Sequence, residues 1–90
     1  MCAQVQLYLS QSQSLKDKRQ VVKSLKERIR SRFNVALAEV EHQELWQRAT
    51  LGLAAVSNEA DHAQKSLDEV IRFIEQDLRV QVLDWEIEER

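Results

Sequence analysis

The chain has 90 residues, of which 43% are hydrophobic and 31% charged, and its net charge is −2. This composition predicts one globular domain over residues 1–90 and excludes an intrinsically disordered chain. No apolar run approaches the ~20 residues of a membrane-spanning helix, the N-terminus lacks the basic start of a signal peptide, and Cys2 has no second cysteine as a partner, so we expect a cytoplasmic protein without disulfides.

Residues 2–9 alternate between apolar and mostly polar side chains, which predicts a half-buried strand. A helix follows from Ser14, whose hydroxyl is suited to cap the first turn, with Asp17 three residues later as in a short capping box. The helix carries an apolar stripe with helical spacing, formed by Leu15, Val22, Leu25 and Ile29.

The same helix concentrates positive charge. Residues 14–32 contain eight Lys or Arg and two acids, a net of +6, so the rest of the chain carries −8. Five of these cations recur every three or four residues in a row beside the apolar stripe, here called the basic flank: Lys16, Arg19, Lys23, Lys26 and Arg30. Such a row suits an acidic partner such as an RNA backbone. The alternative is a solvated face that serves only solubility.

Lys18 differs from these cations because helical spacing places it beside the apolar stripe, on the side expected to face the core. The favoured interpretation is that its methylene stem lies on apolar surface and its amine reaches water. The sharper alternative is an amine placed at the rim of a site.

Residues 35–42 predict a short strand whose facing is ambiguous, which is typical of an edge strand or a bulge. The stretch 43–58 fits a helical and a strand period equally well, and helix propensity leaves an extra helix over 39–56 as an open alternative. Gly52 weakens either assignment, unless it marks a bulge or a close approach of the backbone.

A second, acidic helix is predicted over 59–77, with Asn58 as its N-cap. Its expected apolar stripe consists of Ala60, Ala63, Leu67, Val70, Ile71, Ile74 and Leu78. Residues 80–88 then alternate as a last strand, for which we expect Leu83, Trp85 and Ile87 to face inward, Trp85 within the core, and Val82, Asp84, Glu86 and Glu88 to face outward.

The predicted order strand, helix, strand, strand, helix, strand corresponds to the α+β ferredoxin-like split βαβ fold. Right-handed crossovers place both helices on one face of a four-stranded antiparallel sheet, with the first and third strands at its centre. The other face stays open and is expected to carry Gln4, Gln6, Tyr8, Thr50, Gly52, Ala54, Val56, Val82 and Asp84. It suits a partner sheet, so a homodimer through this face or through an edge strand is a hypothesis.

Two clusters invite a chemical interpretation. Glu39, Glu41, His42 and Glu44 combine carboxylates with an imidazole, but strand geometry turns His42 away from Glu39 and Glu41, which favours a polar hairpin tip over a metal or acid–base site. Trp46 is expected to pack on the rim of the core, and its alternative role is a stacking surface beside the charge of Arg48. We find no phosphate-binding loop, CxxC or HExxH motif, and so assign no catalytic residue, metal site, cofactor or small-molecule substrate.

The stretch SLKDKRQVVKSLKERIRSRFNVALAEVEHQELWQRATLGLAAVSN resembles the bacterial YlxP-like family, small proteins grouped as a domain of unknown function. The resemblance implies a ferredoxin-like fold and favours a loop and a strand, not a helix, over 43–58. It implies no reaction. Genes of the family often lie beside those of transcription elongation, translation initiation and ribosome maturation factors, which suggests a role near ribosomal RNA or the ribosome.

Two functional hypotheses follow. In the first, the chain binds structured RNA or the ribosome through the basic flank and Arg48, with Lys18 and Trp46 at the rim of the site. In the second, it is a protein-interaction domain that uses its open sheet face or an edge strand and binds no nucleic acid. An enzymatic role would require Lys18, Glu39, Glu41 and His42 to converge in a pocket.

Overall fold

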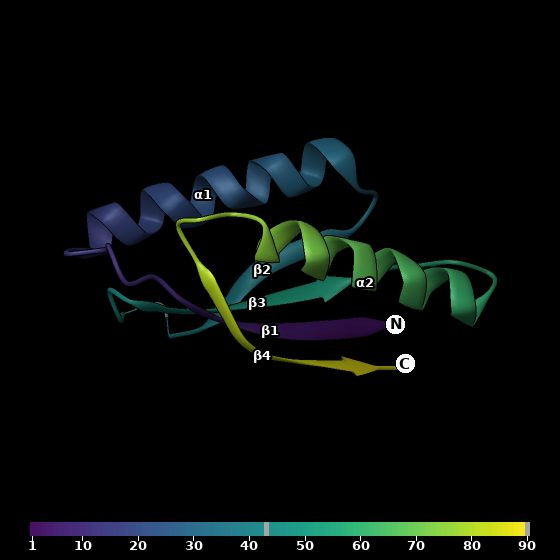
Figure 1. The fold of residues 1–90 in the computed structure, drawn as a ribbon. Helices are drawn as coiled ribbons and strands as arrows, with labels where there is room; N and C mark the ends of the chain where they lie inside the picture. Colours follow the sequence, from purple (N-terminus) through teal and green to yellow (C-terminus); the bar gives the residue numbers. More distant parts are fainter. Residues whose placement is uncertain (43, 90) are drawn as a thin grey trace.

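The computed structural model describes residues 1–42 and 44–89. Its elements follow the predicted order: β1 (Cys2–Tyr8), α1 (Leu15–Arg32), β2 (Ala36–Glu41), β3 (Arg48–Ala54), α2 (Ala60–Glu75) and β4 (Gln81–Glu88). Both helices lie on one side of the sheet (Figure 1). The ferredoxin-like α+β fold predicted from the sequence is therefore confirmed.

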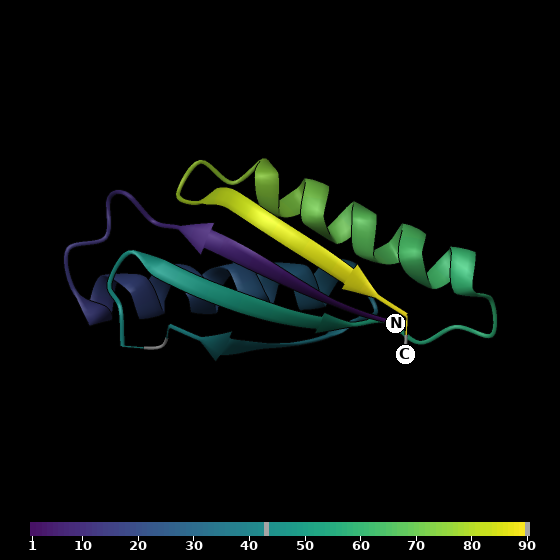
Figure 2. The same ribbon diagram turned by 90° about the horizontal axis from the view of Figure 1, so that it is seen from below.

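The four strands are antiparallel and lie in the order β2-β3-β1-β4. Strand β1 pairs with β3 from Cys2 opposite Ala54 to Tyr8 opposite Arg48, and with β4 on its other side. The view from below shows the sheet in front of α1, with β2 and β4 at its edges (Figure 2). The prediction of central first and third strands and an open second face is confirmed.

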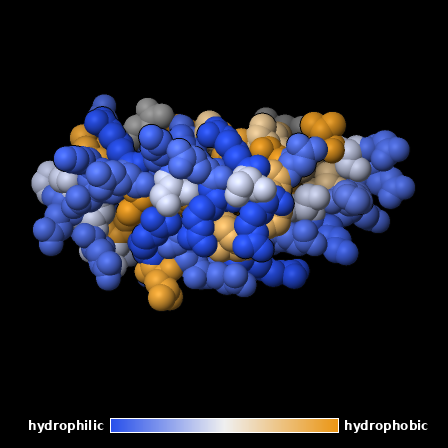
Figure 3. Space-filling model, turned by 90° about the horizontal axis from the view of Figure 1, so that it is seen from above, coloured by the Kyte–Doolittle hydropathy of each residue, from blue (hydrophilic) through white to orange (hydrophobic). Residues whose placement is uncertain are grey.

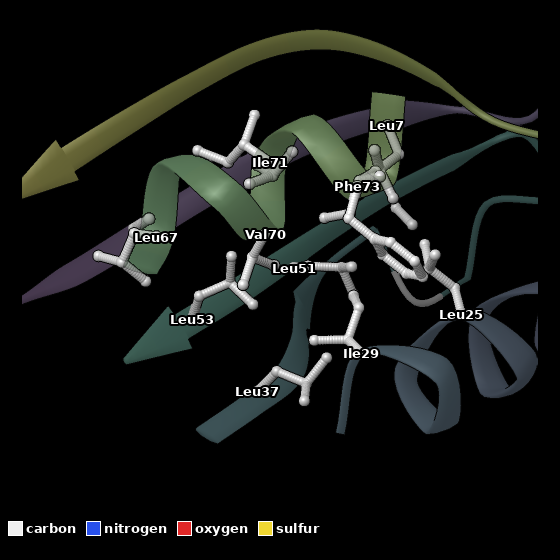
Figure 4. Packing of buried hydrophobic residues seen from close by; sticks show 14 of the residues in the cluster. Leu7, Leu25, Ile29, Leu37, Leu51, Leu53, Leu67, Val70, Ile71 and Phe73 are labelled. Atoms are coloured by element: carbon white, nitrogen blue, oxygen red, sulfur yellow. The ribbon is translucent and has the colours of Figure 1, made fainter. Parts of the chain in front are cut away.

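The core fills the space between the helices and the sheet. Alternate residues of β1 are buried there, together with Ala49, Leu51 and Leu53 of β3, as period-2 strands with one covered face require. The buried seam of α1 includes Val22, Leu25 and Ile29. From α2, Phe73 extends toward Leu25 (Figure 4) and contributes a large side chain that the predicted stripe of this helix had omitted.

The start of α1 has the predicted cap at Ser14, but the Asp17 carboxylate bonds one residue before the cap instead of closing a reciprocal capping box. Ser14 Oγ accepts a hydrogen bond from the backbone N–H of Asp17 at 3.0 Å. Asp17 Oδ2 in turn accepts from the backbone N–H of Gln13 at 3.1 Å. The first bond satisfies a donor that the first turn of a helix leaves without an intrahelical partner, and the second ties the residue before the cap to that turn.

The second helix is shorter than predicted. It runs from Ala60 to Glu75, and the residue at its N-cap position is Glu59, which makes no side-chain capping bond, so the assignment of Asn58 as cap was wrong. Ala60 is exposed and Leu78 is 97% exposed, because both lie outside the turns that pack on the sheet. The remaining predicted stripe is buried as expected.

The expected facing of β4 was wrong in its first half. The register shifts between Gln6, opposite Asp84, and Leu7, opposite Val82, which leaves Leu83 as an extra residue. Val82 therefore packs against the core rather than lying on the open face, and Leu83 is exposed. Trp85 lies opposite Val5 on the helix side, but this edge strand is poorly covered there and the residue is 48% exposed, not core.

The ambiguous stretch after β2 forms strand β3, so the alternative helix over 39–56 was wrong. Edge strand β2 contains a register irregularity between Glu39 and Glu41, which confirms the expectation of an edge strand with a bulge. Gly52 marks a close approach, because a Cβ at this position would lie 3.0 Å from Val40 Cγ1 across the open face.

Candidate nucleic-acid interface

The structure divides the cations of α1 between two flanks. On the flank toward α2, Arg28 pairs with Asp77 at 3.3 Å, and the guanidinium groups of Arg28 and Arg32 lie 5.3 and 4.9 Å from the centroid of the Phe73 ring. Both distances suit cation–π contact. These two cations therefore hold α1 against α2.

Asp77 is the anion at the centre of this contact. It accepts hydrogen bonds from the side chain and the backbone of Arg79, and Arg79 Nη1 also donates to Ser24 Oγ on α1 at 3.2 Å. The Arg79 side chain holds the pKa of Asp77 below its ordinary value of 3.8, although burial opposes this shift. The same pair raises the pKa of Arg79. The turn after α2 is thus fixed to α1 by charge-assisted hydrogen bonds.

The basic flank lies on the opposite side of α1, along β2. Arg30 Nη2 donates to the Leu37 carbonyl at 3.1 Å, which covers one outward backbone group of the edge strand. Within the described residues, the other four cations of the flank form no ion pair: Lys16, Arg19, Lys23 and Lys26. The helix face seen from above is largely hydrophilic (Figure 3). The flank therefore presents uncompensated positive charge to solvent.

Lys18 does not reach water, so the favoured sequence interpretation was wrong. Its side chain is 0% exposed, and its Nζ lies 2.7 Å from Glu39 Oε2 on β2. Nζ also donates to the backbone carbonyl of His42, whose φ of 62° places it in the left-handed region. Lys18 thus lies beneath the β2–β3 hairpin and not at the rim of a site.

Trp46 lies on this hairpin and is 55% exposed, so the expectation that it packs on the core was wrong. Leu45 beside it is also exposed. A shallow pocket at this position is lined by Glu44, Leu45, Trp46, Gln47 and Arg48.

The predicted site residues do not form one patch. Arg48 lies opposite Tyr8 in the sheet, and cross-strand partners share a face, so it belongs to the open face rather than to the basic flank. Its Nε is buried without a hydrogen-bond partner among the described residues. Arg48 therefore lies with Trp46 in the lining of the hairpin pocket, whereas the basic flank lies along α1.

The carboxylate and imidazole cluster does not converge. Glu39 points to Lys18, His42 contributes its carbonyl, and the His42 imidazole lies 4.0 Å from Glu41 Oε2. Across the part of the chain that the structure describes, no group of three or more His, Cys, Asp or Glu is arranged to hold a metal ion. Glu39 and the His42 carbonyl instead contact Lys18 and so connect the hairpin to α1.

Two features of this end of the molecule escaped sequence reasoning: the role of Glu39 as the partner of Lys18, and the exposure of Leu45. A signal for the first was present, because a lysine in a core-facing position is almost always paired when it is fully buried. No comparable signal existed for Leu45, since the exposure of a loop residue depends on how the hairpin packs.

Comparisons with known proteins give one consistent result. The model of a family described as "Protein of unknown function (DUF503)" matches residues 1–87. The chain is also 42% identical over 62 residues to "Uncharacterized protein YlxP" of Bacillus subtilis (strain 168), a match that covers 69% of this chain and 67% of the relative. Neither α1 nor α2 is long and apolar enough to cross a lipid bilayer.

Proposed function

Because this chain belongs to the DUF503 family of proteins of unknown function, its role has to be inferred from its surface, and we propose that it binds the backbone of structured RNA through the basic flank. The supporting observation is the row of four cations on α1 that lack a carboxylate partner among the described residues. Phosphates that such cations neutralise release counterions, which supplies most of the free energy of sequence-independent binding.

The geometry of α1 suits a folded RNA. Lys16 and Arg30 are 14 positions apart, which corresponds to about 21 Å along a helix at 1.5 Å per residue. A row of that length can contact several phosphates of one strand. The central strands β1 and β3 offer only Tyr8 as an aromatic side chain, so the sheet is not the stacking surface of an RNA-recognition module. Recognition by charge and shape is the mode that remains.

The test compares two double charge reversals that lower the net charge equally. Lys23→Glu with Lys26→Glu reverses the centre of the basic flank. Lys65→Glu with Arg72→Glu reverses two exposed cations of α2. Affinity for a short RNA hairpin is measured over a series of salt concentrations.

We expect the flank variant to bind at least about tenfold more weakly and to reduce the slope of log affinity against log salt by about 1.8, which is 0.9 for each lost phosphate contact. The α2 variant should keep the wild-type slope. Equal effects of the two variants, or an unchanged affinity of the flank variant, would contradict the proposal.

A cytoplasmic protein that acts near ribosomal RNA fits this proposal. The second candidate is a protein-interaction domain that binds a second copy of this chain, and one observation favours it. The half of the open face formed by β2 and β3 is a shallow depression of small and apolar side chains, including Ala36, Ala38, Val40, Gly52 and Ala54. Sedimentation of wild type and Ala38→Glu checks this candidate, because a homodimer through that face would dissociate in the variant.

A further inference from the structure

We propose that the exposed Trp46 ring is a stacking site for one unpaired RNA base, next to the duplex held by the basic flank. This inference rests on the proposed function and extends it, because it specifies an RNA with a bulged or looped-out nucleotide. The ring is 55% exposed although it is the largest apolar group of the hairpin. A ring of this kind normally lies against the core of a domain.

The hairpin that carries Trp46 is held from both sides. On one side Lys18 Nζ, from the first turn of α1, donates to the His42 carbonyl. On the other side Gln47 Nε2 donates to the carbonyls of Ser10 and Ser12, each at 3.3 Å. The backbone adds a bond from Leu9 N–H to the Gln47 carbonyl at 2.9 Å. Trp46 therefore lies on a positioned loop, so that little conformational entropy is lost when a ligand contacts it.

The buried ion pair beneath the loop also favours a positioning role. Burying Lys18 and most of Glu39 removes their hydration, and this cost offsets much of their attraction, so such a pair adds little net stability compared with apolar residues. The ion pair instead fixes the relative position of the two elements that carry it. It joins α1 to β2, and through the left-handed His42 it fixes the direction in which the hairpin leaves the strand.

The surrounding charges indicate which part of a nucleotide occupies the pocket. Glu44 and Arg48 both line the pocket, so their opposite charges offset each other and the pocket has no net attraction for phosphate. Lys16 and Arg19 lie on the same first turns of α1 as Lys18, which contacts the loop. The hairpin and the N-terminal end of α1 also lie at the same end of the molecule (Figures 1 and 2). Phosphates therefore belong over Lys16 and Arg19, and the uncharged base belongs on the ring.

The experiment uses two probes, a short RNA hairpin and the same hairpin with a one-nucleotide adenosine bulge. Both are titrated into the full chain carrying Trp85→Phe, because Trp85 is also exposed and would otherwise contribute to the fluorescence. We expect the bulged probe to bind more tightly than the plain hairpin by roughly 5- to 150-fold, the range of one stacked base. Its binding should quench the fluorescence of Trp46.

Three variants in the same Trp85→Phe background separate stacking from simple contact. Trp46→Ala should abolish the preference for the bulged probe over the plain hairpin. Trp46→Phe should keep part of the preference, because a smaller ring still stacks. Trp46→Leu, which is apolar but has no ring, should behave like Trp46→Ala.

The outcomes distinguish this inference from the proposed function. If the plain hairpin binds with the expected salt dependence but the bulge adds no affinity, the stacking site is refuted and the basic flank stands. If Trp46→Leu keeps the full preference, the ring does not stack and the inference is likewise refuted. If neither RNA binds, the proposed function fails and the stacking site fails with it.

Discussion

Removal of the buried Lys18 amine tests the account of the hairpin most directly. Lys18→Met keeps the length and apolar stem of the side chain but removes the buried cation that lies 2.7 Å from the Glu39 carboxylate. Loss of one partner from a buried pair costs about 3–5 kcal/mol of unfolding free energy. Glu39 retains 15% exposure of its side chain, so water can partly replace the amine, and we expect a value near 3 kcal/mol.

The double variant Lys18→Met with Glu39→Met removes both charges and should lie within about 1 kcal/mol of wild type, because no charge then stays buried alone. Urea denaturation followed by far-UV circular dichroism gives the unfolding free energies for this double-mutant cycle. Lys16→Met, an exposed cation two residues away, is the matched control and should change stability by no more than about 0.5 kcal/mol. A double variant as unstable as Lys18→Met, or a loss below about 1 kcal/mol for Lys18→Met itself, would refute the reasoning.

Two further predictions concern stability. The pKa of Asp77 is lowered by Arg79, so its ionised form stabilises the folded state above the ordinary value of 3.8 and this contribution is lost as pH falls below that value. Asp77→Asn should therefore lower the urea midpoint at neutral pH and make it less sensitive to acid below about pH 4, whereas an unchanged acid dependence would count against the Arg79 contact. For the open face, Gly52→Ala should destabilise by up to about 1 kcal/mol, because the new methyl meets Val40. Thermal unfolding should show that adding Val40→Ala removes this penalty, and a double variant less stable than Gly52→Ala would show the contact to be harmless.

Much of the fold could be predicted from local pattern. The cap at Ser14, the apolar seam of α1 and the alternation of β1 depend on residues a few positions apart, so period and capping chemistry suffice to recognise them. The row of cations on α1 was visible for the same reason. The bounds of the second helix were predicted less accurately, because its N-terminus lacks a capping side chain that would mark the boundary.

The features that sequence reasoning missed depend on distant contacts. The burial of the Lys18 amine depends on Glu39. This carboxylate lies 21 positions later and becomes a neighbour only when β2 folds beneath α1. The exposure of Trp85 follows from its place on an edge strand and from the shift opposite Gln6 and Leu7. An alternating pattern shows which residues share a face, but not how completely a neighbouring helix covers that face.

The central position of β1 has a consequence for how the chain reaches its fold. Cys2 lies opposite both Ala54 and Glu88, which are 52 and 86 positions away. Pairings over such separations require large loops to close, so we expect this chain to fold more slowly than a helical bundle of equal length. During synthesis β1 is made before both of its partner strands. Its backbone therefore stays unpaired, and its apolar side exposed, until β3 and then β4 have been made. This first strand is therefore the segment that most needs protection from wrong association in a newly made chain.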